Sequence, residues 1–338
     1  MNSGRLALVT GGGGFLGNSI ARQLLAAGWS VRVLGRKARP ELESAGAQVL
    51  RGDIAEEDRV IKACIGVEAV FHAAALTGIW GDRGRFHFTN VLGTHNVIAA
   101  CRRQGVPRLI YTSSPSVVFS GNDHVMGDET LPYPDSHLCH YSRSKSLAER
   151  AVLAANDPPH LATVALRPHL VWGPGDPHLV PRIVARARAG RLVRVGYGNN
   201  RVDLTYIENA AQAHLAAEQA LRAGRAAGKA YFVTNGEPVE LWGWIADLLG
   251  RLKIPAPRLT VPASMAYLLG GGLETLWNLL LLPGEPPMTR FLARELSTTH
   301  TYNISAARRD LGYEPKISMA QGLENLLAHL EVSSRREQ

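Results

Sequence analysis

The sequence predicts an α/β fold in which a doubly wound parallel sheet carries a smaller C-terminal lobe. The chain has 338 residues and 46% of them are hydrophobic, which at about 150 residues per domain suits two units or one large one. Short apolar runs alternate with segments of helical length through the first half, and a glycine-rich turn follows the first run. Alternation of this kind is typical of a parallel sheet with helices on both faces.

Six apolar runs are the predicted strands of this sheet, and each of the first five precedes a segment of helical length. They are continuously apolar instead of alternating, as expected for strands that are buried on both faces. A helix is predicted over 141–155, before the last of them. The runs cover residues 6–10, 31–34, 49–50, 69–72, 108–113 and 162–166.

The pattern changes after Pro168, where prolines and glycines cluster and the alternation is lost. We therefore assign 1–170 to a cofactor domain to which later segments return, 171–330 mainly to a substrate lobe, and 331–338 to a polar, frayed tail. The apolar segment 266–282 is first interpreted as a buried helix of the lobe. A lipid-facing or partner-binding helix is the alternative, because Glu274, Asn278 and three consecutive glycines argue against a membrane span.

Composition excludes several classes of protein. Three widely spaced cysteines, with no C-x-x-C pair, predict neither disulfides nor a metal site and suit a reducing compartment. The net charge of +8 suits anionic small ligands, and no motif supports nucleic-acid binding. The N-terminus has no signal-peptide pattern, so we expect a cytoplasmic protein.

The glycine-rich turn predicts a dinucleotide site of the Rossmann type. Gly11, Gly14 and Gly17 follow the first strand with the spacing T-G-x-x-G-x-x-G and lead into a helix. Glycines let the backbone approach a pyrophosphate, and the first amides of the helix, at Phe15 and Leu16, face that anion.

The end of the second strand predicts NADP(H), with NAD(H) less favoured. An NAD site needs an acidic residue there to bind the ribose 2′-hydroxyl. This strand ends in Gly35, followed by Arg36 and Lys37, which suit a 2′-phosphate. A merely solvated turn is the alternative.

Tyr141 and Lys145 form the candidate proton-transfer pair. Their Y-x-x-x-K spacing places both side chains on one face of a helix. A nearby ammonium group lowers the pKa of a tyrosine, which can then give or take the proton of a carbinol.

A glycine loop of this spacing followed later in the chain by Y-x-x-x-K resembles the sequence pattern of the extended short-chain dehydrogenases/reductases. The resemblance implies that Ser114 donates a hydrogen bond to the substrate oxygen. Ser113 and Ser116 are its alternatives, because the alignment leaves the register open by a residue or two. Asn90 is implied to help hold a water relay. His72 is expected to be a packed core residue. The other cofactor contacts that the resemblance implies are Asp53, Ile54, Ala73, Ala74, Ala75, Thr112, Pro168 and Val171.

Within that group, Y-T-S-S-P-S-V-V-F at 111–119 resembles the 3β-hydroxysteroid dehydrogenase/isomerase family, and 172–183 and 283–291 resemble a bacterial branch that reduces 2-alkyl-3-oxoalkanoates. The resemblance implies an oxidoreductase with a lipophilic substrate, and a homodimer formed by the helices of Asn90 and Tyr141. A steroid or sterol substrate, a nucleotide-sugar epimerase and a non-catalytic NADP sensor stay open as alternatives.

Overall fold

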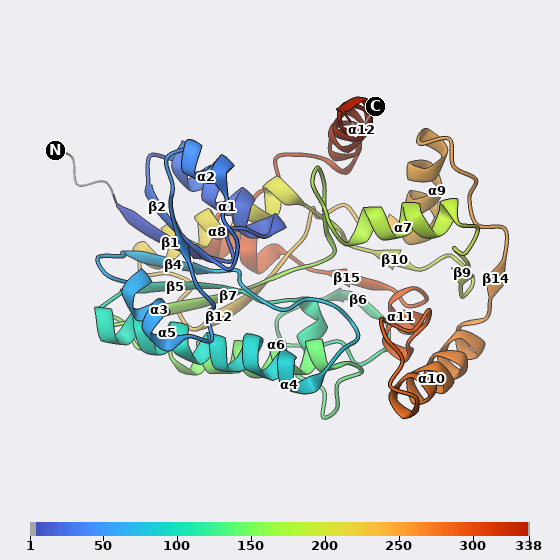
Figure 1. Cartoon of the computed structure of the whole chain (residues 1–338), viewed down its shortest axis with the longest axis horizontal. Helices are drawn as coiled ribbons and strands as arrows, with labels where there is room; N and C mark the ends of the chain where they lie inside the picture. The colour runs from blue at the N-terminus through green and yellow to red at the C-terminus, as the bar shows by residue number, and fades with distance from the viewer. Residues whose placement is uncertain (1–4, 337–338) are drawn as a thin grey trace.

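The computed structural model describes residues 5–336, and within them seven parallel strands form a central sheet (Figure 1). Its strand order is β12-β7-β5-β4-β1-β2-β3, so the chain reverses direction across the sheet between β1 and β4. Ligands of doubly wound sheets bind at such a switch point, outside the carboxyl ends of the strands. The strands of the sheet are β1 (Leu6–Thr10), β2 (Ser30–Gly35), β3 (Gln48–Arg51), β4 (Ala69–His72), β5 (Arg108–Thr112), β7 (Ala162–Pro168) and β12 (Lys229–Val233).

Helices cover both faces of the sheet. The helices of the first half are α1 (Phe15–Ala26), α2 (Pro40–Ser44), α3 (Glu57–Ala63), α4 (Arg83–Phe86), the π-helical η1 (His87–Leu92), α5 (Gly93–Gln104), the short η2 (Pro115–Val117) and α6 (His140–Ala154). Those of the second half are α7 (Leu179–Arg188), α8 (Ile207–Arg222), α9 (Leu241–Arg251), α10 (Ala263–Leu279), α11 (Arg290–Glu295), the π-helical η3 (Ala307–Leu311) and α12 (Met319–Arg336).

Burial on both faces explains the continuously apolar strands. Val9 and Phe71 pack with α1 and α8 on one face, whereas the neighbouring Leu8 and Val70 pack with α3, α5 and α6 on the other. All four side chains are fully buried. The six strands predicted from the sequence are confirmed, with bounds that differ by at most two residues at either end.

Two later elements pack with the first half of the chain. Strand β12 pairs in parallel with β7, and α8 packs against α1. The remaining strands form small sheets in or beside the C-terminal lobe. They are β6 (His124–Gly127), β8 (Val171–Trp172), β9 (Arg194–Val195), β10 (Arg201–Val202), β11 (Thr205–Tyr206), β13 (Val239–Glu240), β14 (Thr260–Val261) and β15 (His300–Tyr302).

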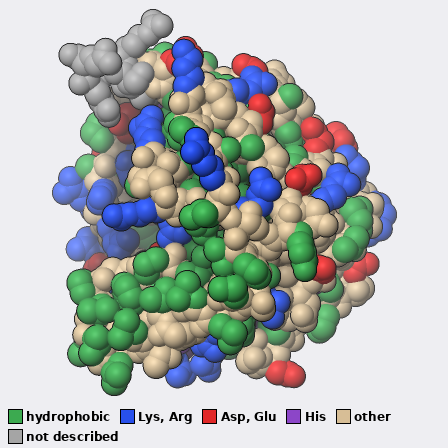
Figure 2. All heavy atoms as spheres, turned by 90° about the vertical axis from the view of Figure 1, so that its right-hand side faces the viewer, with side chains coloured by type: hydrophobic (Ala, Val, Ile, Leu, Met, Phe, Trp, Pro, Cys, Tyr) green, Lys and Arg blue, Asp and Glu red, His purple; other side chains and the backbone are tan. Residues whose placement is uncertain are grey.

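One interpretation of the second half is wrong. Helix α10 is not buried, because it packs through the small residues Ala266 and Gly270 and leaves leucines such as Leu268 exposed. Figure 2 views the side of the molecule where α10 lies and shows hydrophobic side chains gathered over its lower half. No helix in the described residues is long and apolar enough to cross a membrane. Helix α12 runs to Arg336, within the predicted tail 331–338, and 337–338 lie outside the described residues.

Candidate active site

The glycine loop joins β1 to α1 in a conformation that requires glycine. Gly11 has a φ of +72°, and a Cβ there would lie 2.6 Å from the Ala74 backbone. A Cβ at Gly17 would lie 2.2 Å from the carbonyl oxygen of Gly11. Gly14 is the N-cap of α1 and offers no side chain to its first amides, at Phe15 and Leu16. The loop therefore presents close backbone and unpaired N–H groups, which fits the pyrophosphate of a dinucleotide.

Cations surround the end of β2. Arg36 and Lys37 are exposed, and a Cβ at Gly35 would meet nothing within 4 Å, so there is space at the position where an acid would bind a ribose. Sequence reasoning missed Arg39. Its Nε is buried without a hydrogen-bond partner and would lie 2.7 Å from a Cβ on Gly13 of the glycine loop. The sequence signal for Arg39 was that it is the third cation in G-R-K-A-R. Only the conformation of the turn brings its side chain to the glycine loop.

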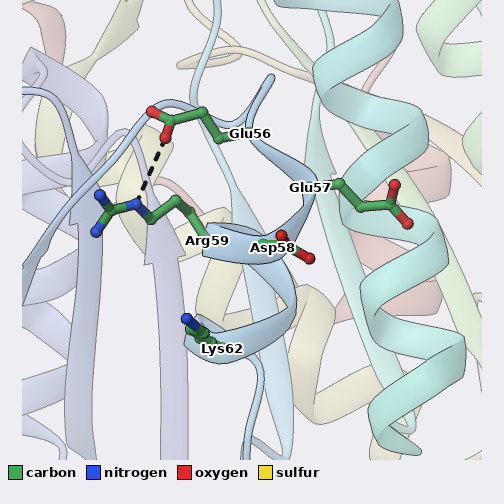
Figure 3. Close-up of a pocket in the computed structure, with 5 residues that line it drawn as sticks. All are labelled: Glu56, Glu57, Asp58, Arg59 and Lys62. Atoms are coloured by element: carbon green, nitrogen blue, oxygen red, sulfur yellow. Dashed lines mark ion pairs between the residues drawn. The ribbon is translucent and has the colours of Figure 1, made fainter.

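Asp53 and Ile54 follow β3, where the resemblance placed the adenine. The Asp53 carboxylate accepts a hydrogen bond from the Ala55 amide at 3.0 Å, and Ile54 is buried against Gly93 of α5. The open hollow alongside is lined by five charged side chains around α3 (Figure 3): Glu56, Glu57, Asp58, Arg59 and Lys62. Its polar, solvated lining makes it a poor place for a lipophilic substrate.

The small residues Ala73, Ala74 and Ala75 follow β4 beside the glycine loop. His72 before them is fully buried, as expected of a core residue. Its ring bonds the hydroxyls of Thr10 at 2.7 Å and Thr94 at 2.9 Å. Burial lowers the pKa of His72 to about 3, and the positive charge of Lys145 acts in the same direction. A neutral histidine with both nitrogens engaged is not available for proton transfer.

Tyr141 and Ser114 meet at the carboxyl end of β5. Tyr141 lies in the first turn of α6, and Ser114 lies two residues beyond β5 as the N-cap of η2. Burial raises the pKa of Tyr141 to about 12, and a hydrogen bond with the Ser114 side chain acts in the opposite direction. Of the three serines left open by the sequence, Ser114 thus lies at the tyrosine, whereas the hydroxyls of Ser113 and Ser116 are buried without partners.

Lys145 lies one turn beyond Tyr141 on α6. Its ammonium group donates to the Thr112 carbonyl and lies 4.1 Å from the centre of the Tyr111 ring. Burial lowers the pKa of Lys145 to about 7, partly offset by the charge of Glu149. The lysine is therefore positioned by backbone and ring contacts, in surroundings where its charge is costly.

The Thr112 hydroxyl points to a buried histidine. It bonds Nε2 of His214 at 2.8 Å, while Nδ1 of that ring lies 2.7 Å from the Ala210 carbonyl oxygen. Nδ1 must donate to that carbonyl, so Nε2 accepts from Thr112. Burial also lowers the pKa of His214 to about 4. In this structure Thr112 offers its carbonyl to Lys145 and its hydroxyl to α8.

Asn90 lies in the π-helical segment η1 and is 1% exposed. Its amide group donates to Leu76 O at 3.0 Å and Ser144 Oγ at 2.9 Å, and its carbonyl accepts from Leu76 N at 2.7 Å. Ser144 lies between Tyr141 and Lys145 in α6. Asn90 therefore joins the loop after β4 to the catalytic helix, and π segments are common at functional sites.

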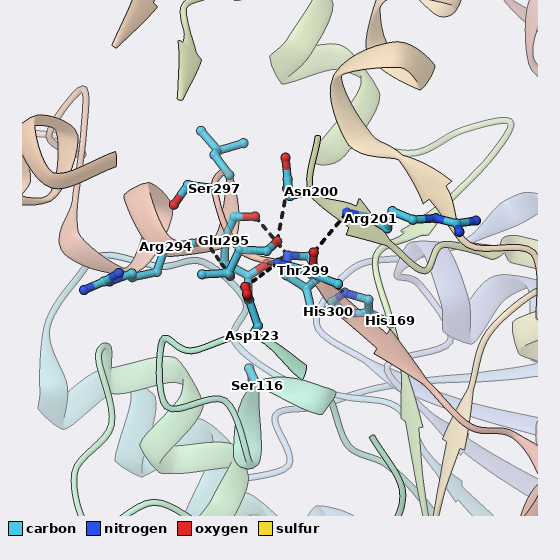
Figure 4. A network of polar contacts seen from close by, with 12 residues as sticks. Ser116, Asp123, His169, Asn200, Arg201, Arg294, Glu295, Ser297, Thr299 and His300 are labelled. Carbon is cyan, nitrogen blue, oxygen red and sulfur yellow. Dashed lines mark hydrogen bonds and ion pairs between the residues drawn. The ribbon is translucent and has the colours of Figure 1, made fainter. Parts of the chain in front are cut away.

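Pro168 and Val171 lie where β7 leaves the central sheet for the lobe. Pro168 ends β7, and Val171 begins β8, which pairs with β11. Between them, His169 Nε2 lies 2.7 Å from His300 Nδ1, and His300 Nε2 lies 2.9 Å from the Glu295 carbonyl oxygen (Figure 4). This buried network ties β15 and α11 to the end of β7, so it holds the lobe against the cofactor edge.

Residues 8–262 match the family model described as the 3-beta hydroxysteroid dehydrogenase/isomerase family. The chain belongs to this family. As a family member it has a Rossmann-like fold and is an NAD(P)-dependent oxidoreductase. The matched region contains the glycine loop, Asn90, Ser114, Tyr141 and Lys145.

Three similar proteins widen the comparison. The 2-alkyl-3-oxoalkanoate reductase of Stenotrophomonas maltophilia is 49% identical over 95% of this chain and 98% of its own. The sterol-4-alpha-carboxylate 3-dehydrogenase, decarboxylating, of Mus musculus is 37% identical over 94% of this chain and 88% of its own. The structure of MoeE5 in complex with UDP-glucose and NAD has a TM-score of 0.73 and 25% identity, covering 97% and 99% of the two chains.

The arrangement suits proton transfer beside a nicotinamide, which in this family supplies or accepts a hydride. The Ser114 and Tyr141 hydroxyls can both reach one substrate oxygen, because they already meet each other. Tyr141, with its raised pKa, is protonated at neutral pH, the form that donates a proton in the direction of reduction. Two donors at one oxygen also stabilise the negative charge that develops on it.

Proposed function

We propose that the chain is an NADP(H)-dependent reductase that converts a 2-alkyl-3-oxoalkanoate into the 2-alkyl-3-hydroxyalkanoate. The observation that carries the chemistry is the meeting of Ser114 and Tyr141 at the carboxyl end of β5. Hydride addition to the 3-oxo carbon would be matched by a proton from Tyr141 to the carbonyl oxygen, while Ser114 donates a hydrogen bond to that oxygen. The positive charge of Lys145 would stabilise the phenolate that Tyr141 becomes when it gives up this proton.

The names of the two curated relatives support the substrate class. In a 2-alkyl-3-oxoalkanoate, the carbon next to the oxygenated carbon carries both an alkyl group and the carboxylate. In a sterol 4-carboxylate that reacts at position 3, the same groups stand in the same relation. An acid with a branched carbon beside its carbonyl or carbinol is thus common to both. The 49% identity to the reductase favours the open-chain acid over the sterol.

The cations around β2 support NADP(H). Arg36 and Lys37 follow β2, Arg39 has a buried and unpaired Nε at the glycine loop, and Gly35 stands where NAD enzymes of this fold place an acid. A 2′-phosphate would find guanidinium donors here and no carboxylate that repels it.

The test measures oxidation of a 2-alkyl-3-hydroxyalkanoic acid by NADP⁺ and by NAD⁺, beside a 4-carboxylated 3β-hydroxysterol. The hydroxy acid is used because 3-oxo acids lose carbon dioxide readily. We expect NADP⁺-dependent turnover of the open-chain acid, reduced about 10²–10⁴-fold by Tyr141→Phe with unchanged NADPH binding. Turnover of the sterol alone would assign the substrate to the other relative's class. Turnover that survives Tyr141→Phe would refute the proton-transfer role.

A further inference from the structure

A chain of buried hydrogen bonds crosses the central sheet at its switch point. Thr10 ends β1 and His72 ends β4, and the two residues are partners across these strands. The Thr10 hydroxyl lies 2.7 Å from Nδ1 of His72, and Nε2 of the same ring lies 2.9 Å from the hydroxyl of Thr94 on α5. These three side chains are at most 1% exposed, so the bonds between them are shielded from solvent.

The proton positions along these bonds follow from a backbone carbonyl. The single hydroxyl proton of Thr94 is donated to the backbone oxygen of Asn90 at 2.6 Å, so Thr94 can only accept from His72. His72 therefore carries its proton on Nε2, and its Nδ1 accepts from the Thr10 hydroxyl. The lowered pKa of His72 keeps the ring in this neutral form. Thr10 in turn accepts from the backbone N–H of Ala74 at 3.4 Å.

Asn90 extends this series of hydrogen bonds to the catalytic helix α6. Its side-chain nitrogen donates to the Ser144 hydroxyl at 2.9 Å, and that hydroxyl donates to the backbone oxygen of Tyr141 at 2.8 Å. The rest of the Asn90 amide group is bonded to the Leu76 backbone. Every side-chain nitrogen and oxygen in the series, which we call the His72 chain, is therefore paired. Its side chains are those of Thr10, His72, Thr94, Asn90 and Ser144.

The His72 chain connects the glycine loop with the candidate proton donor. At one end, the Ala74 backbone lies against this loop, because a Cβ on Gly11 would come within 2.6 Å of it. At the other end is the backbone of Tyr141, in the first turn of α6. A fully paired polar network in a buried setting holds its members in one arrangement. A displacement at either end is therefore resisted along the whole chain of bonds.

We infer that His72 and Thr94 are positioning residues that set Tyr141 in register with the cofactor. A neutral imidazole suits this place, because its two nitrogens accept on one side of a rigid ring and donate on the other. Without the Thr94 hydroxyl, the Asn90 backbone oxygen and Nε2 of His72 would both lose a buried partner, and η1 would shift to regain one. The inference rests on the proposed proton transfer from Tyr141, whichever acid or sterol is the substrate.

The kinetic test compares two substitutions of one residue. Thr94→Val keeps nearly the same shape and removes the hydroxyl, whereas Thr94→Ser keeps the hydroxyl. We expect Thr94→Val to lower kcat by about 10- to 100-fold, as small displacements of a reacting group do, with the KM for NADP⁺ within about threefold of the wild type. Thr94→Ser should recover most of the lost kcat. The substrate is whichever of the hydroxy acid and the hydroxysterol the wild type oxidises, so a wrong substrate assignment leaves the comparison intact.

Thr163→Val is the matched control, because it also removes a fully buried hydroxyl that donates to a helix carbonyl. Thr163 lies near the start of β7, away from the carboxyl ends of the strands, and donates to the backbone oxygen of Val152 on α6 at 2.9 Å. Both valine variants should lower the Tm by a similar amount, but only Thr94→Val should lower kcat. An equal loss of kcat in the two, or a wild-type kcat in Thr94→Val, would overturn the inference.

A second measurement needs no substrate. In ¹⁵N NMR of the labelled chain, we expect the His72 ring to be neutral and protonated on Nε2 between about pH 5 and 8. The signal of this ring is the one that His72→Gln removes. A proton on Nδ1, or titration in that range, would overturn the inference. Turnover that survives Tyr141→Phe contradicts the proposed function instead, so the two can fail separately.

Discussion

At and just after the end of β2, Gly35 and Arg39 are expected to set the choice of cofactor. Gly35→Asp adds a carboxylate where the structure has open space, and Arg39→Gln removes the cation at the glycine loop. The carboxylate would accept from a ribose 2′-hydroxyl and repel a 2′-phosphate. Because a hydrogen bond to a charged group contributes about 1.5–3 kcal/mol, we expect each change to lower the NADP⁺/NAD⁺ ratio of kcat/KM by roughly 10- to 100-fold.

The matched control for the cofactor variants is Arg59→Gln, an exposed arginine of α3 beside the hollow of Figure 3. It should leave the NADP⁺/NAD⁺ ratio unchanged. A ratio that also stays constant in both β2 variants would mean that the cations there are only a solvated turn.

Lys145 should make stability depend on pH. Its pKa is about 7 in the folded chain, against an ordinary value of 10.5. Between these values the unfolded chain holds one more proton than the folded chain, so the free energy of unfolding rises with pH by up to about 1.4 kcal/mol per unit. Below pH 7 the lysine is charged in both the folded and the unfolded chain, so the folded chain bears the full free-energy cost of burying that charge.

Lys145→Met removes this titration. We expect the Tm of the variant relative to wild type to be greatest below pH 7 and to fall as the pH rises toward 10.5. Thermal unfolding across that range measures the difference, and Lys316→Met, at an exposed lysine, should follow the wild type. Parallel curves for Lys145→Met and wild type would show that the lysine titrates as it does in water.

The sequence predicts individual residues well where a short motif fixes the geometry. Y-x-x-x-K places Tyr141 and Lys145 on one helical face whatever surrounds them. The glycine spacing acts in a similar way at Gly17, since a Cβ there would collide with the Gly11 carbonyl oxygen of the same motif, whereas the close neighbour of Gly11 is the Ala74 backbone. Arg39 could not be assigned, because its place beside Gly13 depends on a turn. The choice among Ser113, Ser114 and Ser116 could not be made from the sequence either, because it depends on how η2 begins.

Among the elements, α10 provides a paired test of close packing. Gly270→Ala would place a Cβ 2.6 Å from the Thr289 backbone, so the two helices must separate, and we expect a loss of about 1–3 kcal/mol in the free energy of unfolding. Gly272→Ala, in the same helix, meets nothing within 4 Å and should gain about 0.5–1 kcal/mol through helix propensity. Urea denaturation midpoints measure both changes. Equal effects of the two substitutions would contradict the packing of α10 on α11.

Helix α10 also shows why its burial could not be predicted from the sequence. Leucines three and four residues apart define an apolar face, but they do not say whether that face meets a core or the outside. The decisive information is which face packs on α11. Here small residues do so, since only a glycine at 270 allows the approach to Thr289. Strands of the central sheet lack this ambiguity, because both of their faces are covered.

On the scale of the whole molecule, a second group of exposed apolar side chains lies on η1 and α6, and Figure 1 shows α6 apart from α10. Phe88 and Leu92 of η1 are 54% and 40% exposed, and Leu147 of the adjacent α6 is 40% exposed. We predict that two copies pair through this surface, across helices that hold Asn90 and Tyr141. A two-fold interface uses the same patch on both copies, so each substitution in it acts twice.

The dimer prediction is tested by the mass of the chain in solution. Light scattering should give twice the mass of 36.6 kDa for the wild type and a single chain for Phe88→Glu/Leu147→Glu, because the added charges face one another across the two-fold axis. The variant Leu268→Gln/Leu279→Gln on α10 should remain dimeric, since these exposed leucines lie on a different element. A monomeric wild type would remove the dimer, whereas dissociation by the α10 variant alone would transfer the interface to that helix.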